Sequence, residues 1–178
     1  GTEIGLRKNL ALMSKISTRI DLDEEQLVKE LEKLGMKKEG DGVDVFFNGI
    51  YIGGAENYKD FTEQVRNKRR ELKLPDELSI RYDKQINSIL ILGDIGRVLR
   101  PLIIVKNGKP MLDDSHIESL KNGSLTWKGL LEHGIIEYID ASEEENCLVS
   151  ITKDKLTNEN THLEIDKIAF LGPITSSK

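Results

Sequence analysis

The fold of this chain is decided by one stretch, Gly93-Asp94-Ile95-Gly96-Arg97-Val98-Leu99-Arg100-Pro101-Leu102-Ile103-Ile104-Val105, a glycine-rich turn followed by an apolar run. The run is mostly β-branched or aliphatic, which predicts a strand. Pro101 cannot donate a backbone hydrogen bond, so we expect it at an edge, a bulge or a strand start. Arg97 and Arg100 must reach solvent or find partners, because an unpaired buried charge is costly. The stretch holds no nucleophile, acid–base pair or phosphate-binding loop.

Composition limits the class of protein. The chain has 178 residues, 38% hydrophobic and 32% charged, which suits one ordinary domain or two small ones. A formal net charge of −5 argues against a free-standing electrostatic binder of nucleic acid, which is usually basic. Cys147 is the one cysteine, so an intrachain disulfide is excluded and a reducing, cytoplasmic location is expected. No apolar run approaches the roughly 18 residues that span a bilayer.

Residues 21–76 predict a small α+β module made of a helix, a hairpin and a second helix. Asp21 or Asp23 can cap the first helix, over 21–34. Asn48-Gly49 between two short apolar runs predicts a tight hairpin turn. The second helix covers 57–74.

That second helix contains the one local basic run of the chain, which comprises Arg66, Lys68, Arg69, Arg70 and Lys73. We interpret the run as a solvated helix face, because no aromatic residues are interleaved with it. The alternative is a contact with a neighbouring subunit or with a phosphate backbone.

Residues 77–178 predict a second, β-rich module of mostly antiparallel strands with one or two helices. A helical region over 114–133 is expected to break at Asn122-Gly123, with Ser124 or Thr126 capping its second piece. Strands are expected over 78–82, 88–92, 98–105, 135–139, 148–151 and 162–165. The fold class expected for the whole chain is therefore α+β, in two small modules.

Other chemistry is sparse, and no catalytic residue or metal site is predicted. Asp140 and the run Glu143-Glu144-Glu145 could attract Mg²⁺, but consecutive acids in a loop point in different directions. We expect these acids to meet an arginine instead, with Arg97 and Arg100 as candidates. The three histidines lack metal-binding spacing and are interpreted as surface or capping residues: His116, His133 and His162.

Several of these segments resemble one protein family. Residues 96–102 are similar to a GRVxRPL signature, and residues 130–146 to a GLLEYIDAEEEE passage, with Ser142 where an acid is common. Residues 45–53 are similar to a VFxNGxxxG hairpin, and residues 5–13 to the segment that follows an ETPEG motif. All four belong to the second-largest subunit of multisubunit DNA-directed RNA polymerases, in its archaeal and eukaryotic form.

The resemblance implies that the chain is a fragment of this second-largest subunit. Residues 1–20 would end the fork region, 21–76 would form the first external module and 77–178 the second. Arg7 and Lys8 would lie near the active centre. The remaining motif positions would be structural: Gly96, Arg97, Arg100, Pro101, Tyr138, Asp140, Glu143 and Glu144.

The parent enzyme would be a nucleotidyltransferase that transcribes DNA from nucleoside triphosphates, with its catalytic Mg²⁺ bound outside this fragment. The fragment itself would need no cofactor and would be inactive alone. Its partners would be the rest of the second-largest subunit and other polymerase subunits, with DNA and RNA contacted only through the assembled enzyme and no membrane involved. The alternative is a stand-alone interaction module that binds a protein or a nucleic acid through its acidic loop or basic helix.

Overall fold

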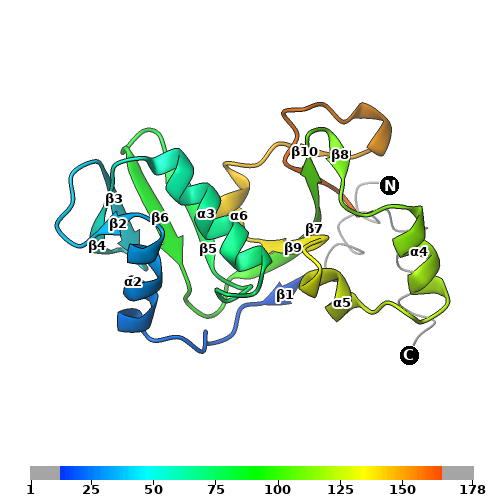
Figure 1. Ribbon diagram of the computed structural model, residues 1–178, viewed down its shortest axis with the longest axis horizontal. Coiled ribbons are helices and arrows are strands. Elements are labelled where there is room, and N and C mark those ends of the chain that lie inside the picture. The colour runs from blue at the N-terminus through cyan, green and yellow to red at the C-terminus, as the bar shows by residue number, and fades with distance from the viewer. Residues whose placement is uncertain (1–12, 166–178) are drawn as a thin grey trace. The chain divides into compact units, whose positions relative to one another are not determined.

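The computed structural model describes residues 13–165, which form two compact units (Figure 1). The first unit comprises residues 16–99 and 140–146, and the described part of the second comprises 13–15, 100–139 and 147–165. Helices and two mixed sheets confirm the α+β class. Within residues 13–165, no helix is both long enough and apolar enough to span a membrane.

The first unit is built on a five-stranded sheet in the order β2-β4-β3-β6-β5. Strands β3 and β6 are parallel and the other neighbours are antiparallel. Its elements are α2 (Glu24–Lys33), β2 (Met36–Lys37), β3 (Val43–Phe47), β4 (Ile50–Ala55), α3 (Tyr58–Arg70), β5 (Ser79–Asp83), β6 (Ser88–Leu92) and α6 (Ala141–Glu144).

Local sequence explains the first elements. Asp23 caps α2 in a capping box with Gln26, whose side chain bonds back to the Asp23 backbone. Asn48 and Gly49 form the hairpin turn with φ of 48° and 83°, the left-handed pair that a tight hairpin requires. One hydrophobic core joins the apolar stripes of α2 and α3 to the inward side chains of the sheet.

Strands β5 and β6 extend the sheet of the β3–β4 hairpin. Asp44–Phe47 of β3 is in register with Ser88–Ile91 of β6, which in turn pairs with β5. Chain order places these two strands in the second predicted module, because they follow the first module in the sequence. A parallel pairing between distant segments, such as β3 with β6, cannot be read from the sequence alone. The compact units therefore contain different residue ranges from the predicted modules. The module boundaries at residues 20 and 76 stay a prediction.

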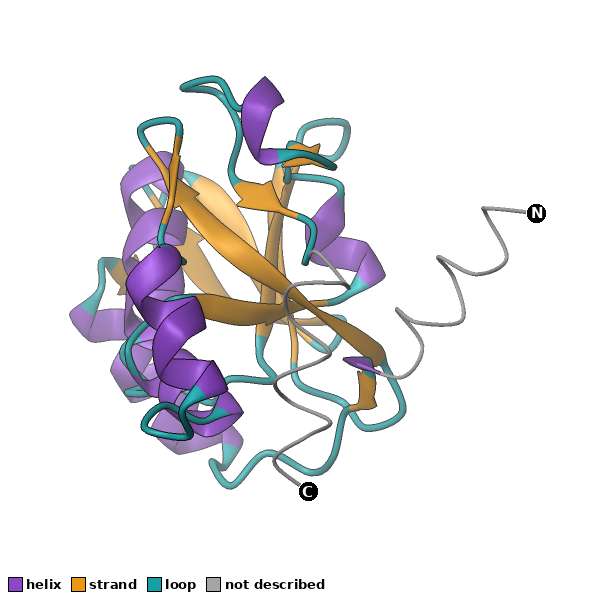
Figure 2. Cartoon of the chain, turned by 90° about the vertical axis from the view of Figure 1, so that its right-hand side faces the viewer, coloured by secondary structure: helices purple, strands orange, loops and turns teal. Residues whose placement is uncertain are grey.

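The second unit is organised around the long strand β7 (Val98–Lys106), one of the orange strands in Figure 2. The first two residues of this strand belong to the first unit. Strands β8, β9 and β11 pair antiparallel with β7, β1 also pairs with β7, and β10 is parallel to β11. The remaining elements are β1 (Lys15–Ile16), β8 (Lys109–Pro110), α4 (Asp114–Lys121), α5 (Trp127–Glu132), β9 (Ile136–Ile139), β10 (Val149–Ser150), a 3₁₀ helix (Lys153–Lys155) and β11 (His162–Leu163). The predicted break of the helical region near Asn122-Gly123 is present, with Thr126 capping α5.

Pro101 lies inside β7, which is neither an edge strand nor bulged there. The backbone N–H of Ile104 donates to Ile135 on the β9 side, whereas that of Val105 donates to Thr161 on the β11 side. Because N–H directions alternate along a strand, the nitrogen of Pro101 faces the β11 side. There β11 is registered only with Ile103 and Ile104, so the missing N–H costs no ladder bond to β11.

Candidate functional site

The most distinctive polar site of the first unit lies along β5, the edge strand of its sheet. An exposed strand edge presents unpaired backbone groups that invite pairing with another chain. In this unit, side chains from α3 and from the α6 segment bond to those groups, so the edge is closed without a further strand. We call the four side chains Arg66, Arg69, Glu143 and Asn146 the edge clamp.

Arg69 and Glu143 form the buried centre of the edge clamp. Their side chains are 2% and 1% exposed, with Nη1–Oε1 and Nη2–Oε2 distances of 2.5 and 2.8 Å. Arg69 Nη1 also donates to the carbonyl of Leu78 at 2.9 Å, and the N–H of Ile80 donates to Glu143 Oε1 at 3.0 Å. A fork-to-fork pair of this kind fixes geometry as well as supplying charge-assisted bonds.

Arg66 and Asn146 complete the edge clamp. Arg66 Nη2 donates to the carbonyl of Ile80 at 3.2 Å, and its Nε lies 3.5 Å from Glu143 Oε2. The amide of Asn146 accepts from the N–H of Tyr82 at 2.7 Å and donates to its carbonyl at 3.0 Å, much as a paired strand would. The edge clamp therefore binds the strand backbone rather than a small ligand.

These contacts correct two expectations. The basic run of α3 is not wholly a solvated face, because Arg69 is buried and Arg66 is mostly so. Glu143 pairs with these two arginines rather than with Arg97 or Arg100. Sequence reasoning missed Arg69, although Phe61, Val65 and Arg69 follow one another at intervals of four, which places Arg69 on the buried stripe of α3.

Arg97 and Asp140 form a second ion pair in the same unit, with Nη1 and Oδ2 2.9 Å apart. Arg97 also donates to the backbone carbonyls of Glu77 and Asp94, at 2.7 and 2.9 Å. Asp140 caps α6 by accepting the N–H of Glu143 at 2.8 Å. The pair thus fixes the start of the helix that delivers Glu143 to the edge clamp.

The two other motif residues of this unit have simpler surroundings. Gly96 has a φ of +88°, in the left-handed region that glycine tolerates best, and its N–H donates to the carbonyl of Ser17. Glu144 is half-buried on α6, beside the fully buried Glu143.

In the second unit the motif residues hold the sheet together. Arg100 pairs with Glu164, with Nη1 and Oε1 2.6 Å apart. Tyr138 lies opposite Pro101 in the β7–β9 ladder, and its hydroxyl accepts a hydrogen bond from Trp127 Nε1 at 2.9 Å. The ammonium of Lys15 lies 4.3 Å from the centre of the Tyr138 ring.

One histidine differs from expectation. His162 is 3% exposed, and its Nε2 lies 2.7 Å from Glu137 Oε1, itself buried. It is therefore a core residue paired with a carboxylate rather than a surface one. The burial of His162 could have been suspected from its position at the start of a predicted strand. In a strand, every second side chain faces the core. His116 bonds the N-cap residue Asp113 of α4, and His133 is the C-cap of α5.

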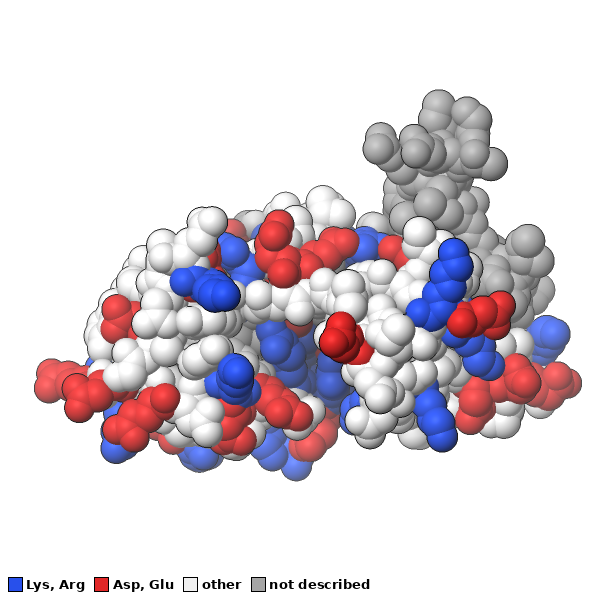
Figure 3. All heavy atoms as spheres, turned by 90° about the horizontal axis from the view of Figure 1, so that it is seen from above, with Lys and Arg blue, Asp and Glu red and all other residues white. Residues whose placement is uncertain are grey.

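The described residues also bear on the predicted chemistry of the acidic run. Among residues 13–165, no group of three or more histidine, cysteine, aspartate or glutamate side chains could hold a metal ion. Asp140 forms an ion pair with Arg97, and Glu143 forms one with Arg69. These ion pairs disfavour the alternative of a Mg²⁺ site on the acidic run. Figure 3 shows acidic and basic side chains interspersed on the face that it presents. Arg7 and Lys8 lie outside the described residues.

Comparison with known proteins gives matches along most of the chain. The family model for RNA polymerase Rpb2, domain 4, matches residues 45–106, and that for domain 5 matches residues 127–168. The chain is 37% identical over 195 aligned residues to DNA-directed RNA polymerase subunit Rpo2 of Sulfolobus acidocaldarius, covering 99% of the chain. It is 34% identical over 185 residues to DNA-directed RNA polymerase III subunit RPC2 of Schizosaccharomyces pombe, covering 98%.

The chain spans about a sixth of the length of these relatives, 17% and 16% respectively. The two family models fall in the order in which the resembling motifs occur, and they cover both units. Archaeal and eukaryotic relatives match alike, in agreement with the form of the subunit that the motifs indicated. The chain belongs to the family of second-largest subunits of DNA-directed RNA polymerases, in the region of domains 4 and 5.

Proposed function

We propose that the chain is a structural, non-catalytic region of a DNA-directed RNA polymerase, the enzyme that synthesises RNA on a DNA template from nucleoside triphosphates. The proposal rests on the contacts that the motif residues make with one another and with Arg69. Arg97 and Asp140 bond to each other, and Glu143 bonds to Arg69, all inside one unit. Side chains committed in this way stabilise a scaffold and are not available to a substrate.

The finer assignments follow from the family. The region would supply the external domains of the second-largest subunit and would contact the rest of that subunit and other polymerase subunits. DNA and RNA would be reached only through the assembled enzyme, whose catalytic Mg²⁺ would be bound elsewhere. Arg7 and Lys8 would belong to the fork strip near the active centre, and the enzyme would work in the cytoplasm of an archaeal cell.

An immunoblot of source-cell lysate, fractionated by size and probed with antiserum against this chain, tests the proposal. We expect a band several times larger than 20.1 kDa that co-fractionates with template-dependent RNA synthesis. A band at 20.1 kDa in fractions without polymerase would contradict it. The purified 178-residue chain should itself synthesise no RNA.

The stand-alone alternatives are less well supported by the contacts. An acidic module would need free carboxylates, yet Asp140 and Glu143 are engaged by arginines. A nucleic-acid binder would need the basic run, yet Arg66 and Arg69 are engaged by Glu143. Both alternatives therefore lose the buried part of the runs on which they depended, while Glu145 of the acidic run and Lys73 of the basic run stay exposed.

A further inference from the structure

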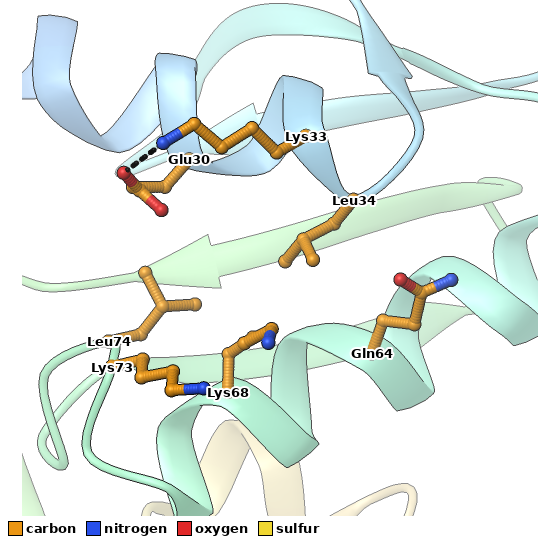
Figure 4. Close-up of a pocket in the computed structure, with 7 residues that line it drawn as sticks. All are labelled: Glu30, Lys33, Leu34, Gln64, Lys68, Lys73 and Leu74. Atoms are coloured by element: carbon orange, nitrogen blue, oxygen red, sulfur yellow. Dashed lines mark hydrogen bonds and ion pairs between the residues drawn. The ribbon is translucent and has the colours of Figure 1, made fainter.

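A groove of about 380 Å³ lies between the C-terminal halves of α2 and α3, away from the edge clamp (Figure 4). Leu34 and Leu74 point into it from opposite sides and form its apolar floor. Its polar rim comprises Glu30, Lys33, Gln64, Lys68 and Lys73. All of these residues belong to the first unit, so the groove is complete within it.

The rim of the groove is locally basic in a chain of net charge −5. Lys33 pairs with Glu30 at 2.9 Å, whereas Lys68 and Lys73 share the single carboxylate of Glu71, at 3.6 and 3.0 Å. Three lysines against two glutamates leave one positive charge in excess. The pKa of Glu71 is lowered, chiefly by its hydrogen bond from Lys73 and the charge of Lys68, so this carboxylate stays ionised beside the groove.

The turn that supplies Lys73 and Leu74 contains an unusual residue. The N–H groups of Leu72 and Lys73 bond to the carbonyls of Arg69 and Lys68, which is the Schellman ending of a helix. The left-handed position of this motif is usually glycine, but here it is Leu72, with a φ of +59°. The Leu72 side chain is also 43% exposed, so folding does not explain why a strained, apolar residue occupies this turn.

We propose that this groove is a docking site for an acidic segment of a partner protein, in which carboxylates flank aliphatic side chains. The aliphatic side chains would cover the exposed Leu72 beside the groove, whereas Leu34 and Leu74 of its floor are already buried, at 9% and 3% exposure. The carboxylates would pair with Lys68 and Lys73, which outnumber the acid that they share. Charge complementarity selects an acidic partner, and the volume of the groove suits a few side chains rather than a folded domain.

The test is a titration of the ¹⁵N-labelled 178-residue chain with the synthetic peptide EELLEEL, followed by amide chemical shifts at low and high salt. We expect shifts concentrated at residues 30–34 and 64–74, and affinity that falls with added salt. The double variant Lys68→Gln with Lys73→Gln should bind about tenfold more weakly, as expected for the loss of two partly exposed ion pairs. The double variant Lys59→Gln with Lys84→Gln removes two exposed lysines outside the groove and should bind like the parent chain.

The variant Leu72→Gly distinguishes a loss of peptide binding from a loss of stability, because the two are expected to change in opposite directions. It should weaken peptide binding severalfold while raising the melting temperature, because the left-handed strain is relieved. The proposal is overturned if EELLEEL does not bind, if its shifts map elsewhere, if KKLLKKL binds as well, or if both lysine double variants lose affinity equally. Unchanged affinity in a stabilised Leu72→Gly variant would remove Leu72 from the site and contradict the proposal as stated.

Discussion

Glu143→Ala is the change that the structure predicts to be most damaging to the first unit. The substitution removes the carboxylate that pairs with the buried Arg69, and the N–H of Ile80 loses its acceptor as well. Removing one partner of a buried ion pair costs about 3–5 kcal/mol, because the other charge is left buried without its counterion. That is a large share of the stability of an ordinary domain, which is about 5–15 kcal/mol.

The assay is guanidinium unfolding followed by far-ultraviolet circular dichroism, together with hydrogen exchange at the amide of Ile80. We expect the free energy of unfolding to fall by about 4 kcal/mol and the protection of Ile80 to drop. Glu145→Ala is the matched control, since Glu145 is an exposed acid on the same segment and should change stability by less than about 0.5 kcal/mol.

A second comparison separates the ion pair from packing. Replacing both partners by apolar residues, in the double variant Arg69→Met with Glu143→Leu, should recover part of the stability that either single change loses. A loss below about 1 kcal/mol for Glu143→Ala, or full protection of Ile80 in that variant, would refute the role assigned to the edge clamp.

Three further changes are expected to have smaller effects. Gly96→Ala should lower the free energy of unfolding by about 1 kcal/mol, because alanine tolerates a φ of +88° poorly; denaturant unfolding measures this, and no loss would show that the turn relaxes freely. Trp127→Phe removes the hydrogen bond to the Tyr138 hydroxyl and should cost about 1 kcal/mol by the same measurement, whereas an unchanged stability would mean that water replaces the indole. The Glu71 carboxyl should titrate below its ordinary pKa in an NMR pH titration and move back up in Lys73→Gln. Because the folded state lowers this pKa, the stabilisation is present above the pKa of the unfolded chain and is lost as the pH falls through the folded value; an unshifted Glu71 would contradict the ion pairs beside the groove.

Local signals in the sequence were sufficient for much of the fold. The acids before α2, the Asn48-Gly49 turn and the break near Asn122-Gly123 are short-range features, and each lies where the sequence indicated. Such features are readable because the capping or turn geometry involves residues only a few positions apart.

The candidate site could be predicted only in part, because its contacts join residues that are distant in the chain. Arg69 and Glu143 are 74 positions apart, and no local pattern shows that a helix after β9 returns to the edge of another sheet. Periodicity along α3 does mark Arg69 as buried, but it does not name its partner. The parallel pairing of β3 with β6 is hidden for the same reason.

The central claim is that the motif residues hold a scaffold together and do not take part in nucleotide addition. The most direct test places Glu143→Ala in the full-length second-largest subunit and measures both the yield of assembled polymerase and the RNA synthesis rate per assembled enzyme. We expect a reduced yield with an unchanged rate per enzyme. A normal yield with a strongly reduced rate would contradict the claim.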